Sequence, residues 1–137
     1  MQNLSYLIIK ASRHLKNKLD KALMEFDITA AQFSVIIQIH LSVAPITAAE
    51  ISQTLGSDRP TISGIINRLE KKGIVLKAAN PKDKRSSYLA ICKECDKLVD
   101  KMKTVSDELT INIFSIYSDE ETEKLTEMIC KLNEGTE

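Results

Sequence analysis

Hydrophobic residues recur every three or four positions along most of this 137-residue chain. That spacing places them on one face of an α-helix. The pattern predicts helices over about residues 3–25, 30–42, 48–55, 59–72, 93–117 and 119–133. Helical spacing is interrupted between about residues 74 and 91. We therefore expect a mainly α-helical fold in a single domain.

Polar residues at the expected helix ends support these boundaries. Thr29 is a suitable N-cap for the second helix. Thr47-x-x-Glu50 has the pattern of a capping box at the start of the third helix. A second capping box, Ser118-x-x-Glu121, opens the last helix. These polar residues therefore mark the starts of three of the expected helices.

The helix predicted over residues 59–72 has two contrasting faces. Gly56 makes the turn into it, and Asp58 and Pro60 are typical of its first turn. Its apolar face consists of Ile62, Ile65, Ile66 and Leu69. Its opposite face carries small, hydrogen-bonding or cationic residues, namely Arg59, Thr61, Ser63, Gly64, Asn67 and Arg68. Such side chains can read base edges and hold phosphates in the major groove of DNA.

A short basic hairpin is predicted directly after that helix. Its strands would cover Ile74–Ala78 and Ser86–Ile91, joined by the turn Asn80-Pro81-Lys82-Asp83. The basic residues at its tip are Lys82, Lys84 and Arg85. An amphipathic helix followed by a basic hairpin is the outline of a winged helix-turn-helix. The alternative interpretation is a solvated charged loop beside an ordinary surface helix.

The charge of the chain is balanced overall but unevenly distributed. Lys and Arg number 19, and Asp and Glu also number 19. Residues 57–88 contain eight basic and three acidic residues, a balance of +5, whereas residues 89–137 contain six and twelve, a balance of −6. A local basic patch is what phosphate binding requires, whatever the net charge. The basic centre therefore favours double-stranded DNA as a partner.

The composition disfavours several other classes of protein. No apolar run approaches the ~20 residues that span a membrane, and no signal-peptide pattern is present. An odd count of three cysteines fits a reducing compartment, so we expect a cytoplasmic protein with no membrane partner. No catalytic motif or phosphate-cradling glycine loop appears, so we expect neither enzyme activity nor a cofactor.

The cysteines admit two interpretations. Cys92 and Cys95 form a C-x-x-C pair, which could be a redox pair or, with Cys130, half of a metal site. A tetrahedral zinc site would need a second pair at ligand spacing, and the sequence has none. We therefore favour three unrelated small hydrophobic residues. His14 and His40 have no His or Cys three or four positions away, so we expect no metal site.

Four segments, which follow one another in the expected order along the chain, resemble those of a known family. They are Ala49-Glu50-Ile51, Leu55-Gly56, Asn67-Arg68-Leu69-Glu70-Lys71-Lys72-Gly73-Ile74-Val75 and Pro81-x-Asp83-x-Arg85. These segments resemble the MarR family of winged-helix transcription regulators, and the Asp-x-Arg pair is fairly specific. The resemblance implies that residues 29–92 form a DNA-binding winged helix-turn-helix lobe. It also implies that residues 1–28 and 93–137 form a helical region that joins two subunits into a homodimer.

The resemblance further implies a sequence-specific DNA-binding transcription regulator. We expect a repressor that binds a pseudo-palindromic operator as a homodimer. A small-molecule effector would bind where the first two helices meet the long fifth helix. Two alternatives stay open, namely a cysteine- or metal-sensing regulator and a winged-helix protein-interaction module. The helix over residues 59–72 would be the recognition helix of the winged helix-turn-helix. The interaction module would need large apolar groups on the exposed face of this recognition helix.

The residues expected to contact DNA lie on the recognition helix and on the wing. They are Asp58, Arg59, Thr61, Ser63, Gly64, Asn67 and Arg68 on the helix, and Lys82, Asp83, Lys84 and Arg85 on the wing. Asn67 is a candidate for a contact with adenine, and Arg68 for one with guanine. Arg85 is expected to enter a minor groove, with Asp83 steadying its geometry. The alternative for that pair is an exposed ion pair worth at most ~1 kcal/mol.

Overall fold

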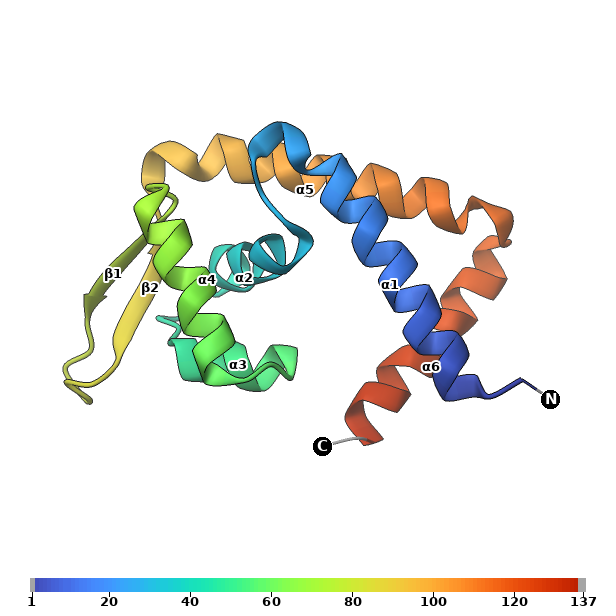
Figure 1. The fold of residues 1–137 in the computed structure, drawn as a ribbon, viewed down its shortest axis with the longest axis horizontal. Coiled ribbons are helices and arrows are strands. Elements are labelled where there is room, and N and C mark those ends of the chain that lie inside the picture. The colour runs from blue at the N-terminus through green and yellow to red at the C-terminus, as the bar shows by residue number, and fades with distance from the viewer. Residues whose placement is uncertain (1, 136–137) are drawn as a thin grey trace. The chain divides into compact units, whose positions relative to one another are not determined.

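The computed structural model describes residues 2–135, which form helices and a two-stranded antiparallel sheet (Figure 1). The elements in chain order are α1 (Leu4–Ala22), η1 (Met24–Phe26), α2 (Ala30–Leu41), α3 (Ala48–Leu55), α4 (Arg59–Lys71), β1 (Val75–Ala79), β2 (Ser87–Ile91), η2 (Lys93–Cys95), α5 (Asp96–Ile113), η3 (Phe114–Ile116) and α6 (Asp119–Gly135), where η denotes a short 3₁₀ helix. The described residues divide into two compact units, 2–106 and 107–135.

The helices begin where the sequence places their caps. The Thr47 hydroxyl accepts a hydrogen bond from the Glu50 backbone N–H at 3.3 Å, which is one of the two bonds of the predicted capping box. At Ser118 both bonds are present, because the Glu121 carboxylate also accepts the Ser118 backbone N–H at 3.0 Å. Thr29 forms a complete box with Gln32 as well. These bonds satisfy backbone N–H groups that have no partner inside the helix.

Helices α1 and α5 are shorter than predicted, because the backbone beside their ends adopts the tighter 3₁₀ conformation. The first was expected to continue to about residue 25, but α1 ends at Ala22 and the 3₁₀ turn η1 follows it. Asp27 then adopts a left-handed conformation with φ of 56° and closes that turn. The fifth helix, expected over residues 93–117, has a 3₁₀ turn at each end, η2 and η3. Such turns are common at helix ends, where α-type hydrogen bonds run out.

The hydrophobic core of the first unit gathers residues from α2, α3, α4, the sheet and the start of α5. Its members are Leu23, Ile28, Phe33, Val35, Ile36, Ile39, Ile51, Ile62, Ile66, Leu69, Ile74, Val75, Leu89, Val99 and Met102. Helix α2 contributes on more than one side, since Phe33, Val35, Ile36 and Ile39 are all buried. This central helix thus supports the elements on either side of it.

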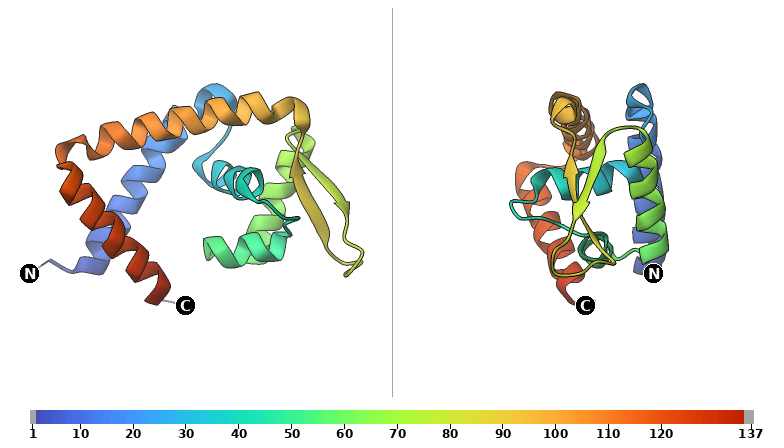
Figure 2. Two further views of the ribbon diagram at one scale, coloured as in Figure 1. Left: turned by 180° about the vertical axis from the view of Figure 1, so that it is seen from behind. Right: turned by 90° about the vertical axis from the view of Figure 1, so that its left-hand side faces the viewer.

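The sheet is a hairpin with one additional contact from outside it. β1 pairs with β2 in an antiparallel register that runs from Val75 opposite Ile91 to Ala79 opposite Ser87. Ile46, in the loop before α3, forms an isolated bridge with Leu89, whose backbone N–H donates to the Ile46 carbonyl at 2.9 Å. This bridge connects the middle of β2 to the loop that leads into α3. Figure 2 shows the hairpin beside α4 from two further directions.

Helix α1 exposes most of its apolar stripe. Within the described part of the chain none of its residues is buried. Its large exposed apolar side chains are Leu4, Tyr6, Leu7, Ile8, Ile9 and Leu15. In the second unit the corresponding exposed side chains are Ile111, Ile116, Tyr117, Met128, Ile129 and Leu132. Each unit therefore presents an apolar surface of its own.

None of the helices formed by residues 2–135 combines the length and the apolar composition that crossing a lipid bilayer requires.

Candidate nucleic-acid interface

Helix α4 is oriented by its buried stripe. Ile62, Ile66 and Leu69 are only 1%, 2% and 0% exposed, so they fix the rotation of the helix about its axis. At 3.6 residues per turn, Gly64 and Asn67 then lie on the opposite side, where both are exposed. The face predicted to meet DNA is therefore the face that the core leaves free.

The start of α4 is fixed by a tight turn and a charged cap. Gly56 adopts the left-handed conformation with φ of +65°, which a residue without a Cβ tolerates best. The Asp58 carboxylate then accepts the Thr61 backbone N–H at 2.7 Å. The same bond holds the pKa of Asp58 below its ordinary value, because it favours the charged form. Asp58 is thus engaged in capping the helix.

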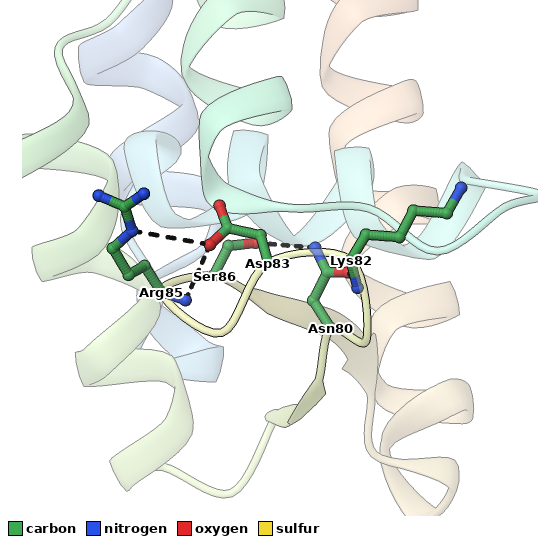
Figure 3. Close-up of polar contacts among 5 residues, drawn as sticks. All are labelled: Asn80, Lys82, Asp83, Arg85 and Ser86. Carbon is green, nitrogen blue, oxygen red and sulfur yellow. Dashed lines mark hydrogen bonds and ion pairs between the residues drawn. The ribbon is translucent and has the colours of Figure 1, made fainter.

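The β1–β2 hairpin is the predicted wing, and the loop between its strands is the wing tip. Hydrogen bonds made by the side chains of this loop give it its shape (Figure 3). The Asn80 carboxamide oxygen accepts the Lys82 backbone N–H at 2.9 Å, and its Nδ2 donates to the Ser86 hydroxyl at 3.1 Å. The Asp83 carboxylate accepts the Arg85 backbone N–H at 2.9 Å. The Arg85 Nε atom lies 3.9 Å from the same oxygen, at the outer limit of an ion pair. Asp83 therefore shapes the turn that carries Arg85.

A cleft of about 160 Å³ separates α4 from the wing. Its lining residues are Thr47, Ala48, Ala49, Arg59, Ser63, Ile66, Asn67, Lys77, Arg85, Ser86, Ser87 and Leu89. The cleft thus brings together three predicted helix residues, Arg59, Ser63 and Asn67, and one predicted wing residue, Arg85. Its cationic groups come from both elements. An anion such as a phosphate would be attracted to this cleft.

The other predicted DNA contacts lie outside this cleft. Thr61, Gly64 and Arg68 are exposed on the rest of the free face of α4, and Lys82 and Lys84 are exposed at the wing tip. The predicted set is therefore spread over two surfaces, the cleft and the outer face of α4 with the wing tip.

Lys77 is a residue of this cleft that the sequence did not single out. Its ammonium donates a hydrogen bond to the Asn67 carboxamide oxygen at 2.7 Å. It also lies 3.5 Å from a carboxylate oxygen of Glu70. The alternation of side chains along a strand could have identified Lys77, because it lies two positions after the buried Val75 and therefore on the same face of β1. That alternation directs Lys77 toward the helix on which Val75 packs.

Both thiols of the C-x-x-C pair donate a hydrogen bond to an oxygen atom. The Cys92 thiol donates to the Glu94 carboxylate at 2.8 Å, and this bond raises the pKa of Cys92. Cys95 donates to the Gly73 carbonyl at 3.6 Å. A raised pKa lowers the fraction of thiolate, which is the reactive form. Between residues 2 and 135, no group of three or more His, Cys, Asp or Glu side chains is placed to hold a metal ion.

A second, larger cavity of about 490 Å³ lies in the first unit between η1 and the start of α5. Its lining residues are Glu25, Phe26, Leu98, Asp100, Lys101, Thr104 and Val105. Beside it, His40 of α2 lies 3.4 Å from Asp100, measured from Nε2 to Oδ1. The cavity is therefore lined by residues of η1 and α5, one of which, Asp100, also contacts α2.

Comparison with known proteins agrees with this geometry. The model of the MarR family matches residues 26–86. The chain is 37% identical over 112 residues to the multiple antibiotic resistance protein MarR of Escherichia coli (strain K12), a match that covers 73% of this chain and 76% of that protein. The structure of an S. aureus MepR–DNA complex has a TM-score of 0.87 and 26% identity, covering 98% of this chain and 99% of that one.

A third comparison concerns the fold. CouR from Rhodococcus jostii RHA1, solved with bound p-coumaroyl-CoA, has a TM-score of 0.84 and 20% identity, covering 96% of this chain and 92% of that one. The mainly helical architecture with a two-stranded wing is shared with these structures, which confirms the predicted winged-helix fold. On the strength of the Escherichia coli relative, the chain belongs to the MarR family of DNA-binding transcription regulators, which are not enzymes.

Proposed function

We propose that this regulator is a repressor that binds a pseudo-palindromic operator as a homodimer. The observation that carries the proposal is the cleft between α4 and the wing, where Arg59, Asn67 and Arg85 converge from two elements. The free face of α4 adds Gly64 and Arg68. Small, hydrogen-bonding and cationic groups suit the edges of base pairs and the phosphates beside them. A protein-binding face would instead expose large apolar groups.

The proposed contacts are of two kinds. Readers are residues that contact the edges of the bases, and clamps are residues that contact the phosphates. On α4, Arg59, Thr61, Ser63, Gly64, Asn67 and Arg68 would face the major groove, behind the cap formed by Asp58. On the wing, Lys82, Lys84 and Arg85 would meet phosphates or a narrow minor groove, with Asp83 holding the turn. Readers supply specificity, whereas phosphate contacts supply affinity and register.

The homodimer is supported by the apolar surfaces of the terminal helices. Leu4 and Ile9 of α1 are 70% and 51% exposed, and Ile116 of the second unit is 80% exposed. Apolar side chains that are exposed in one chain favour burial against another. A second copy is the proposed partner, because a two-fold dimer is the commonest assembly of a single chain. Residues 1–28 and 93–137 would form the dimer region, and residues 29–92 the DNA-binding lobe.

Two-fold symmetry has a consequence for the operator. The recognition helices of the two subunits would enter successive major grooves about 34 Å apart. The operator would then contain two inverted half-sites one helical turn apart. Such a dimer would repress a promoter that overlaps the operator, because bound protein excludes the polymerase from the same DNA.

The proposed effector site is the cavity between η1 and α5. It combines the apolar side chains of Phe26, Leu98 and Val105 with the hydroxyl of Thr104 and the charged groups of Glu25, Asp100 and Lys101. A mainly apolar wall with a few polar groups is typical of small-molecule sites. A ligand there would alter DNA binding only if it bound the DNA-competent and incompetent conformations unequally.

Selection of bound sites from random double-stranded DNA, at one stated salt concentration, tests the proposal. We expect an inverted repeat with half-site centres one helical turn apart. Sedimentation at low micromolar concentration should give about twice the 15.3 kDa chain mass. A monomer would refute the homodimer, and selected sites without inverted symmetry would refute the pseudo-palindromic operator. Failure to select any sequence would favour the protein-interaction module.

A further inference from the structure

Lys77 occupies a central position between the sheet and the recognition helix. It lies on β1, directly opposite Leu89 of β2. Its side chain shares a strand face with Val75, which is fully buried, and is itself only 32% exposed. A lysine at the rim of a core normally extends its ammonium to water. Here the ammonium instead turns toward α4 and lines the cleft.

The ammonium of Lys77 bridges two residues of α4. It donates to the Asn67 Oδ1 atom at 2.7 Å and lies 3.5 Å from Glu70 Oε1. Asn67 and Glu70 are three positions apart, so they are neighbours on the helix surface. The Glu70 carboxylate therefore helps to keep the ammonium beside Asn67. One oxygen lone pair of Asn67 is occupied by this bond, and the plane of its amide is restrained.

We propose that Lys77 is a positioning residue that orients Asn67 and makes guanine, in place of adenine, the base that Asn67 reads. The inference rests on the proposed function, because it assumes that the free face of α4 enters a major groove. It adds a specificity determinant that lies on the wing strand and acts through the recognition helix.

The choice of base follows from the groups that the bonded pair presents. Guanine offers two acceptors in the major groove, N7 and O6, whereas adenine offers the acceptor N7 and the donor N6 amino group. With the Lys77 ammonium engaged by Asn67 Oδ1 and Glu70, the pair presents the Asn67 NH₂ hydrogens and one remaining ammonium hydrogen, all of which are donors. An adenine amino group would have to reach the same oxygen beside a positive charge. Guanine avoids that repulsion and accepts from both groups.

The test compares wild type with Lys77→Met, which keeps the length of the side chain and removes the ammonium. Sites are selected from random double-stranded DNA, and affinities are then measured on duplexes that differ only by G·C or A·T at the position nearest Asn67. We expect wild type to prefer guanine. In Lys77→Met the ratio of affinities for guanine over adenine should fall by about tenfold, the scale of one good base contact.

Three variants separate positioning from other roles. Lys77→Arg should retain the guanine preference, because a guanidinium also donates to Oδ1. In an Asn67→Ala background, Lys77→Met should have no further effect on base preference, since the proposed coupling runs through Asn67. Lys84→Met, at the exposed wing tip, should lower affinity for both duplexes equally. Lys77→Ala provides a second neutral variant if Lys77→Met does not fold.

The outcomes distinguish this inference from the proposed function. An unchanged preference in Lys77→Met, in a wild type that selects a clear site, overturns the inference alone. A loss that persists in the Asn67→Ala background also overturns it, because Lys77 would then contact the base or a phosphate itself. If wild type selects no site, the proposed function fails, and the inference fails with it.

Discussion

Helix α4 and the wing tip meet at the same cleft but are held in place by different interactions. The rotation of α4 is set by buried side chains, of which Leu69 and Ile62 are 0% and 1% exposed. Residues 81–85 of the wing tip are exposed, and the tip is shaped by the Asn80 and Asp83 side chains, which accept hydrogen bonds from nearby backbone N–H groups (Figure 3). The first element is part of the cooperative core, and the second is held locally.

This difference suggests why the two elements would have separate tasks. Base readout requires donors and acceptors in fixed positions, which a helix packed on a core can supply. Phosphate contacts tolerate movement, because they depend on charge more than on direction. A locally held tip that carries Lys82, Lys84 and Arg85 is adequate for them. The predictions below test whether stability, specificity and affinity divide between the elements in this way.

The largest effect is expected from the core beneath α4. Leu69→Ala should lower the free energy of unfolding by about 2–5 kcal/mol, because it removes a fully buried side chain and leaves a cavity. Urea denaturation measures the loss. Lys84→Ala at the exposed wing tip is the matched control and should change the free energy of unfolding by less than about 0.5 kcal/mol. Equal losses would show that the tip belongs to the cooperative core.

The next effect concerns specificity. Arg68 is exposed on α4 and is a candidate for a bidentate contact with guanine. Arg68→Ala should reduce the difference in binding free energy between operator and scrambled duplex by about 1–3 kcal/mol. Affinity for the scrambled duplex should change little. A uniform loss on both duplexes would instead identify Arg68 as a phosphate contact.

A smaller effect is expected from the wing. Arg85→Ala should weaken binding to operator and scrambled duplex alike, because its guanidinium would neutralise a phosphate. The slope of log affinity against log salt should become shallower by about one unit, since one fewer counterion is released. Titration of both duplexes with salt measures the change. An altered sequence preference in Arg85→Ala would mean that the assignment of reader and clamp is reversed.

Features that depend on neighbouring residues could be predicted from the sequence. The cap at Asp58, the box at Ser118 and the stripe of Ile62, Ile66 and Leu69 each lie within a few positions along the chain. Caps and stripes are local, so their patterns are visible in the sequence. The sheet was also predictable, because a turn rich in Asn, Pro and Asp separates two apolar strands.

Features that depend on distant residues were not predicted. The bridge between Ile46 and Leu89 joins segments that are far apart in the sequence. The contact between Lys77 and Asn67 exists only because β1 packs on α4. Nothing within a few positions of Asn67 in the sequence indicates that its amide oxygen is engaged. The sequence could therefore indicate which face of α4 is polar but not which of its groups are already engaged.

Gly64 provides the smallest and most specific test of how α4 is used. A glycine inside a helix costs about 1 kcal/mol relative to alanine. No described residue explains that cost, because a Cβ at Gly64 would meet no heavy atom of other parts of the protein within 4 Å, and the φ of Gly64 is not in the left-handed region. We propose that close approach of a partner surface to the middle of the free face is the reason for this glycine.

Gly64→Ala should therefore change stability and binding in opposite directions. The free energy of unfolding should rise by about 1 kcal/mol, because alanine favours the helix. Operator affinity should fall, because the added methyl group lies on the side opposite the buried stripe, where base edges would approach. Gly135→Ala, at the end of α6, also adds a methyl group into open space among the described residues and should leave operator affinity unchanged. A more stable Gly64→Ala protein that binds operator as tightly as wild type would show that DNA does not closely approach this part of α4.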